Sequence, residues 1–124
     1  MARVALIAIA CSLAGLSARA ADPGSAPAGV YSLMKISSGS LIGLGTLEIR
    51  GKTYRVGEEG AFAPFTQDGS GNITWSAGLD IMPAGWKLGT SIYKGLNKQG
   101  KPLIEIHYTS PRNAAEVIDC VKEK

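Results

Sequence analysis

Few residues of this chain could perform covalent chemistry. Its 124 residues include one histidine, His107, and two cysteines, Cys11 and Cys120. A serine hydrolase needs a serine nucleophile, a base and a group that orients the base. The nearest approach to a Gly-x-Ser-x-Gly nucleophile turn is residues 89–93 (GTSIY), which end in tyrosine where the motif needs glycine. The residue types and their spacing therefore predict that the protein is not an enzyme.

Cys120 is a poor candidate for a nucleophile. The neighbouring Asp119 carries a negative charge, which raises the pKa of a thiol and disfavours the reactive thiolate. Cys11 lies in an apolar N-terminal segment that we expect to be removed, so the mature chain keeps one thiol and no internal disulfide. Unpaired cysteines are commonly buried, and burial is the favoured interpretation. A dimer linked through Cys120 is the alternative.

The sequence contains no recognisable metal or cofactor site. One histidine and one remaining cysteine cannot complete a closed zinc site. Residues 68–72 (DGSGN) alternate oxygen-bearing side chains as calcium loops do, but Ile73 stands where such a loop needs glycine and Leu79 where it needs glutamate. This segment is expected to be a turn. Residues 39–45 lack the Gly-Lys-Ser/Thr of a phosphate loop, and no cofactor is predicted.

Aromatic side chains are the remaining candidates for a binding surface. Phe62 and Phe65 differ in parity, so both cannot face the core from one regular strand. Tyr93 falls opposite the apolar face expected for its segment, and exposed aromatic residues can anchor a ligand or a partner. Packing beneath a loop is the alternative for such residues. The predicted ligand-binding or partner-binding residues are Phe62, Phe65, Trp75, Trp86, Tyr93 and His107.

The N-terminal segment has the features of a signal peptide. Arg3 gives it a positive start, residues 4–16 are almost all apolar but too few to span a bilayer well, and residues 18–20 (ARA) offer the small residues that a signal peptidase reads. We expect cleavage after residue 20, a flexible lead-in over residues 21–29, and a periplasmic or secreted product without a transmembrane span. As an alternative, residues 8–11 (AIAC) resemble a lipoprotein box, in which Cys11 would carry a lipid anchor.

Charge and length exclude several classes of protein. Two of the 13 basic residues, Arg3 and Arg19, and none of the 10 acidic residues precede residue 21, so the mature chain has 11 basic and 10 acidic residues. The basic residues form no cluster of the kind that follows phosphates, and no nucleic-acid partner is predicted. The length fits one domain, residues 30–124, and is too short for an eight-fold β/α barrel or a two-domain dinucleotide enzyme.

Short apolar runs separated by glycine-rich turns predict the fold. The expected strands are residues 30–36, 41–50, 53–56, 60–65, 73–79, 86–93 and 103–109. The tail at residues 113–122 is either a closing strand or a short C-terminal helix, and the strand is favoured because it covers an open sheet edge. The predicted fold class is all-β: a small antiparallel up-and-down meander or barrel of seven or eight strands, calycin-like, whose interior suits packed side chains or one small ligand.

The alternation of apolar and polar residues assigns the inward side chains. They are expected to be Leu47 and Ile49; Tyr54 and Val56; Ile73, Trp75, Ala77 and Leu79; Trp86, Leu88 and Ile92; and Ile104, Ile106 and Tyr108. In the tail, a strand would turn Ile118 and Cys120 inward. Gly43 and Gly45 indicate a bulge or bend in the second strand. Glu105 and His107 share the opposite face of the last regular strand.

A pattern of turn glycines and aromatic residues runs through most of the mature chain. It comprises residues 29–31 (GVY), 51–54 (GKTY), 71–78 (GNITWSAG), the segment 102–106 (PLIEI) and the terminal Cys120. In this arrangement the chain resembles small exported bacterial β-barrel domains of uncharacterised function. In the pattern of that family a cysteine soon after the first tyrosine pairs with the terminal cysteine, whereas residues 31–34 here read YSLM. The resemblance implies a fold and a compartment, and it implies no activity.

Two functions remain as hypotheses. The first is a monomeric, non-catalytic binding or envelope accessory module that holds an unknown small ligand in a cavity beside Trp75 or Trp86. The alternative is a proteinaceous inhibitor of an exported protease or lysozyme, which would contact its partner through residues 60–65 and 67–72. A fully filled interior would count against a ligand inside the barrel.

Overall fold

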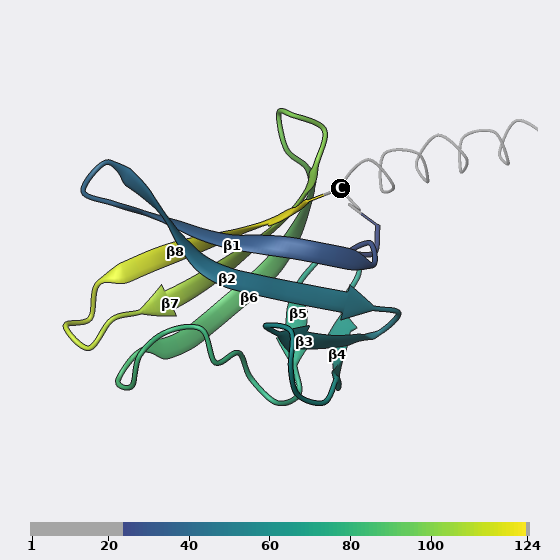
Figure 1. The fold of residues 1–124 in the computed structure, drawn as a ribbon, viewed down its shortest axis with the longest axis horizontal. Coiled ribbons are helices and arrows are strands. Elements are labelled where there is room, and N and C mark those ends of the chain that lie inside the picture. The colour runs from purple at the N-terminus through teal and green to yellow at the C-terminus, as the bar shows by residue number, and fades with distance from the viewer. Residues whose placement is uncertain (1–23, 124) are drawn as a thin grey trace, which may run out of the picture.

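The computed structural model describes residues 24–123, which form a nearly closed β-barrel of antiparallel strands (Figure 1). The strands are β1 (Gly29–Ser37), β2 (Ser40–Arg50), β3 (Thr53–Val56), β4 (Ala63–Gln67), β5 (Ile73–Trp75), β6 (Lys87–Leu96), β7 (Pro102–Thr109) and β8 (Ala115–Lys122). Their spatial order is β5-β4-β3-β2-β1-β8-β7-β6. The predicted all-β class and the small antiparallel barrel are confirmed.

Most of the predictions for the N-terminal segment concern residues outside this part of the chain. The predicted signal peptide, its cleavage site and the lipoprotein alternative at Cys11 lie outside the described residues. Within residues 24–123, no helix is long and apolar enough to cross a membrane. The end of the predicted lead-in is tied to the barrel: the Ala26 N–H donates to the Gln67 side-chain oxygen (3.0 Å), and the Tyr31 hydroxyl donates to the Pro27 carbonyl (2.7 Å).

The C-terminal tail is strand β8, so the alternative of a short helix there is wrong. β8 lies between β7 and β1 and pairs with both, with Cys120 opposite Ile104 on one side and Leu33 on the other. Ile118 and Cys120 point inward and are completely buried, as the strand interpretation predicts. Strand is the favoured state because β8 provides backbone partners for two sheet edges that a helix would leave open.

The β1–β2 hairpin contains the irregularity that its glycines predict. Leu33 pairs with Gly45 and Met34 with Gly43, so Leu44 is an extra residue on β2 and forms a bulge. A two-residue turn closes the hairpin, with positive φ at Ser38 (53°) and Gly39 (79°). Positive φ at both central positions is the geometry whose twist matches that of paired strands.

Packed side chains fill the interior of the barrel. Eight inward side chains are less than 2% exposed: Tyr31, Leu33, Leu47, Ile49, Ile104, Ile106, Ile118 and Cys120. They come from β1, β2, β7 and β8, which form one half of the wall, and Tyr54, Phe65, Ile73 and Trp75 pack against them from the other half. The alternation predicted for the second and seventh strands is confirmed, since Leu47, Ile49, Ile104, Ile106 and Tyr108 are all buried.

The fifth strand is shorter than predicted. It ends at Trp75, and the chain then turns, with the Gly78 N–H donating to the Trp75 carbonyl (3.0 Å). The Tyr54 hydroxyl holds this turn: it accepts from the Ala77 N–H (3.1 Å) and donates to the Gly78 carbonyl (2.6 Å). Ala77 is therefore exposed instead of inward. The fourth strand is displaced as well, from the predicted residues 60–65 to Ala63–Gln67.

The inward face predicted for β6 is correct at Leu88, which pairs with the buried Tyr108, and wrong for the residues after it. Leu88 pairs with Tyr108 and Ser91 with Ile106, so Gly89 and Thr90 together oppose one residue and form a bulge. The bulge reverses the parity along the strand. Ser91 and Tyr93 consequently point inward (2% and 4% exposed) and Ile92 does not, while Trp86 precedes the strand and is half-buried. Only a partner strand reveals such a bulge, because the alternation of residues on either side of it looks regular.

Cys120 is expected to be inert in the folded protein. Burial, with a smaller contribution from Asp119, raises the pKa of its thiol above the usual range, and its exposed fraction is zero. A thiol reagent at neutral pH should label Cys120 only in molecules that have opened, whereas it should label the whole population in denaturant. Intact mass spectrometry over time measures the labelling, and the variant Ser70→Cys, in an exposed turn, provides a rapidly labelled control.

Rapid labelling of Cys120 without denaturant would contradict this burial. The same burial bears on the predicted alternative of a Cys120-linked dimer, because the Cys120 sulfur cannot reach a second chain unless the barrel opens.

Candidate binding site

The barrel wall has an incomplete junction between β5 and β6. Each of the other neighbouring strand pairs is joined by at least two consecutive paired residues. Between β5 and β6, the one bridge found among the described residues joins Asn72 to Ile92. Beside it, the Tyr93 N–H donates to the Gly71 carbonyl (2.8 Å). We call this junction the seam.

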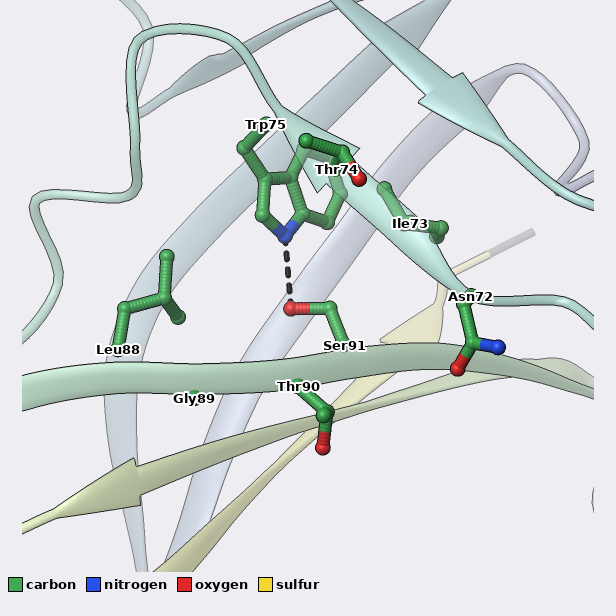
Figure 2. A pocket seen from close by; sticks show the side chains of 8 residues that line it. All are labelled: Asn72, Ile73, Thr74, Trp75, Leu88, Gly89, Thr90 and Ser91. Carbon is green, nitrogen blue, oxygen red and sulfur yellow. Dashed lines mark hydrogen bonds between the residues drawn. The ribbon is translucent and has the colours of Figure 1, made fainter.

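An open cleft of about 340 Å³ lies along the seam. Its lining residues are Asn72, Ile73, Thr74 and Trp75 on the β5 side and Leu88, Gly89, Thr90 and Ser91 on the β6 side. Figure 2 shows the Trp75 indole reaching from β5 toward Ser91, with Leu88 on the same side of β6 and Asn72 at the far end. The cleft, which we call the seam cleft, therefore begins where the two strands separate.

Trp75 is held rigidly beside the seam cleft. Its indole N–H donates to the Ser91 hydroxyl (2.7 Å), and both side chains are buried. The Tyr54 ring packs edge-on against the indole, with centroids 4.7 Å apart, and Phe65 lies 5.6 Å away. This contact between β5 and β6 substitutes a side-chain hydrogen bond for the missing backbone ladder.

The lining of the seam cleft is uncharged. Its polar groups are the Asn72 amide and the hydroxyls of Thr74, Thr90 and Ser91, and none of them titrates near neutral pH. Transferring a charged group into such a lining would cost free energy without an opposite charge to offset it. The seam cleft is therefore suited to an uncharged ligand with apolar parts and hydrogen-bonding groups.

Gly89 allows the bulge that borders the cleft. A Cβ at this position would lie 3.2 Å from the carbonyl oxygen of His107, tighter than an ordinary contact. Glycine therefore lets β6 approach β7 where Gly89 and Thr90 face His107. Bulges of this kind often lie next to binding sites, where they redirect side chains.

Phe62, the first of the predicted binding residues, lies on the outer surface in contact with two arginine side chains. The guanidinium groups of Arg50 and Arg55 lie 4.6 Å and 4.7 Å from its ring centroid. Both arginines also bond to Glu48 (2.9 Å and 3.1 Å), and these bonds, that from Arg50 foremost, lower the pKa of its carboxyl group. Phe62 and Phe65 do lie on different faces, as their parity predicts.

The other predicted residues are dispersed. Phe65 and Tyr93 are buried, so the expectation that Tyr93 faces away from the core is wrong. Trp86 lies under the Lys35 ammonium, 5.0 Å from the ring centroid, and Lys35 in turn pairs with Glu116 (2.9 Å). His107 is on the outer face, with its Nε2 3.5 Å from a Glu105 oxygen. Of the six predicted residues, only Trp75 lines the seam cleft.

Ser91 is the residue of the site that sequence reasoning missed. Its segment, residues 89–93, matches a hydrolase motif only in part, and the alternation predicts that its side chain points away from the core. The bulge at Gly89 and Thr90 turns it inward toward Trp75. No local signal distinguishes it, because the partner that explains it lies 16 residues away.

A second pocket, of about 460 Å³, lies beside the N-terminal lead-in. Its lining residues are Ser25, Ala26, Gly51, Lys52, Phe65, Thr66 and Gln67. It shares no lining residue with the seam cleft, so the two can be separated by substitution.

Known proteins provide no assignment for this site: no protein family, no curated protein and no solved structure matches the chain. The fold and the seam cleft define a small antiparallel barrel with an opening in its wall. Within residues 24–123, no three His, Cys, Asp or Glu side chains are grouped in a way that could hold a metal ion.

Two carboxylates oppose each other on the outer face near His107. Asp119 on β8 pairs directly with Glu105 on β7. Partial burial, followed by the charge of Glu105, raises the pKa of Asp119 above its ordinary value. A raised pKa in the folded state means that ionised Asp119 destabilises the fold, and that this cost disappears as the pH falls below the unfolded pKa, about 3.9.

The variant Asp119→Asn is therefore expected to be more stable at neutral pH by roughly 0.2–1 kcal/mol, the usual size of such cross-strand charge effects. The gain should fade as the pH falls through the raised pKa toward the unfolded value. Urea unfolding of both proteins from pH 3 to pH 8 measures it. Glu105→Gln should relieve the same repulsion, and a lower stability of Asp119→Asn at neutral pH would show the opposite interaction.

Proposed function

We propose that this protein is a non-catalytic binding module, exported to the periplasm or the exterior, that takes an uncharged ligand in the seam cleft. The observation that carries the proposal is the break in the barrel wall beside Trp75. It leaves a cleft of about 340 Å³, within the range of ligand sites, between two strands that the hydrogen bond from Trp75 to Ser91 joins. Export rests on the signal-peptide pattern of residues 1–20.

The proposed site lies in the wall and not inside the barrel. The inward side chains of β1, β2, β7 and β8 are almost completely buried, so a ligand could not reach them from solvent unless the barrel opened. The sequence predicts a ligand cavity beside Trp75 or Trp86. Of these two residues, Trp75 lines the seam cleft, which opens toward solvent, and Trp86 packs against Lys35.

Native mass spectrometry of the protein purified from its own source tests this function. A reproducible adduct on the mature chain is expected, and the variant Thr74→Trp should lose it because the indole would fill the seam cleft. Thr66→Trp is the matched control, since Thr66 pairs directly with Thr74 and is exposed as well, but it lines the second pocket. Loss of the adduct in Thr66→Trp alone would place the ligand in that pocket and overturn the proposal.

Inhibition of an exported protease or lysozyme is the second candidate, favoured by the rigid turn at residues 68–72. One Asp68 carboxylate oxygen accepts from the N–H groups of Ser70 and Asn72, both at 2.9 Å. Pre-organised turns can insert into the site of a partner with little loss of entropy. A lysozyme and a serine protease, each assayed with and without the protein, test this function. Inhibition that Asp68→Ala weakens would favour it over the binding module.

A further inference from the structure

The backbone groups of β5 that face the seam follow from the pairing with β4. The Ser76 N–H donates to the Pro64 carbonyl (3.2 Å), and the Asp68 N–H donates to the Asn72 carbonyl (3.0 Å). Alternate residues of a strand present their backbone groups to opposite neighbours. Ser76 and Asn72 thus face β4, and Ile73 and Trp75 face the seam.

The same reasoning applies to β6. Tyr93 faces the seam, because its N–H donates to Gly71 across it, and Ser91, two residues earlier, faces the same way. The pairing with β7 shows which way the backbone points on the other side of the bulge. Ser91 pairs with Ile106, and Leu88 pairs with Tyr108, two residues further along β7. The backbone of Leu88 therefore also points into the seam.

The first residues of β6 thus form a sheet edge. β5 ends at Trp75, and none of the described strands pairs with residues 87–90 on their seam side. An open edge offers unpaired backbone donors and acceptors, which an added strand can satisfy. On the inner side of this edge lie the apolar side chains of Leu88 and Trp75.

We propose that the ligand of the seam cleft is an extended, uncharged polypeptide segment that adds a short strand to the β6 edge at residues 88–90. This inference rests on the proposed function and names its ligand class. An extended peptide supplies alternating N–H and C=O groups at the spacing of a strand, and its alternate side chains would contact Trp75 and Leu88. The uncharged lining favours a segment without Lys, Arg, Asp or Glu.

The test uses a blocked hexapeptide that alternates threonine and valine, added to the full mature chain. Two-dimensional NMR follows the Trp75 indole and the Leu88 amide, and hydrogen exchange measures protection. We expect both signals to shift and exchange at the Leu88 amide to slow by about tenfold at saturation. The same peptide with an N-methyl group on every residue has the same side chains but lacks the backbone donors of both edges, and it should not bind.

Two variants separate backbone pairing from side-chain contact. Leu88→Ala keeps the backbone N–H and should retain most of the binding, whereas Leu88→Pro removes the N–H and should abolish it. Thermal unfolding checks that each variant folds. If Leu88→Pro is unfolded, the N-methylated peptide alone decides between the two interpretations.

Equal binding of the N-methylated and unmodified peptides would overturn strand addition, although the seam cleft would still be a binding site. An absence of shifts at Trp75 and Leu88 with the unmodified peptide would also overturn it. Neither result bears on the adduct detected by native mass spectrometry and its loss in Thr74→Trp, which test the proposed function separately. An adduct identified as a small molecule instead of a peptide would support that function and contradict the strand.

Discussion

Replacing Ile106 by alanine is expected to lower the free energy of unfolding by about 2–5 kcal/mol. Ile106 lies in the middle of β7, pairs with Ile118 on β8 and Ser91 on β6, and has no exposed surface. Deleting three of its carbon atoms removes buried apolar contacts and leaves a cavity that its neighbours fill only in part. Equilibrium unfolding in urea, followed by Trp fluorescence, measures the change.

Ile36→Ala provides the matched control for this substitution. Ile36 is the same residue type on β1, but 69% of its surface is exposed near the end of the β1–β2 hairpin. The expected change there is within about 0.5 kcal/mol. If Ile106→Ala lowered the free energy of unfolding as little as Ile36→Ala, the interior would not be packed as described. Space for a ligand would then remain inside the barrel.

Ser91→Ala is expected to lower the free energy of unfolding by about 1–3 kcal/mol, because the Trp75 indole N–H loses its acceptor in a buried position. The bond joins β5 to β6, so its loss should also loosen the seam. Urea unfolding gives the cost, and a shift of the tryptophan emission maximum, recorded in the Trp86→Phe background so that only Trp75 emits, reports the altered environment. Ser76→Ala, an exposed serine next to Trp75, serves as the control.

A double-mutant cycle isolates the bond itself. Trp75→Phe removes the donor, so the cost of Ser91→Ala should be much smaller in that background than in the native protein. The same cost in both backgrounds would show that Ser91 acts through packing alone. In that case the seam would be joined by the backbone bridge at Asn72 and Ile92 and by apolar contacts.

The seam begins where β5 ends, at Trp75, and the residues after Trp75 make other contacts. Residues 76–78 could continue the strand in register with their alternation, but the Tyr54 hydroxyl binds the backbone of Ala77 and Gly78. β5 therefore stops after Trp75, and the first residues of β6 are left without a partner on that side. The opening in the wall thus begins where the Tyr54 hydroxyl and the positive φ of Gly78 (69°) end the extended backbone of β5.

Prediction succeeded where alternation and burial agree over a whole strand. Residues 103–109 alternate without interruption, and Ile104, Ile106 and Tyr108 are all buried in β7. It failed at β6, where two residues oppose one and the parity changes within the strand. Of the six candidate binding residues, only Trp75 lines the seam cleft, and the cleft is also lined by Ser91, which the bulge turns inward.

The sequence by itself determined the strand-rich class, most of the inward side chains and the burial of Cys120, because each depends on residue types and on spacing within one segment. Only the tertiary structure decided where β5 stops, which face β6 presents and where the barrel wall opens. These features depend on the Tyr54 hydroxyl, on the register of β7 and on the bond between Trp75 and Ser91. Each of these three contacts joins residues that are distant along the chain. The local alternation of apolar and polar residues therefore does not indicate them.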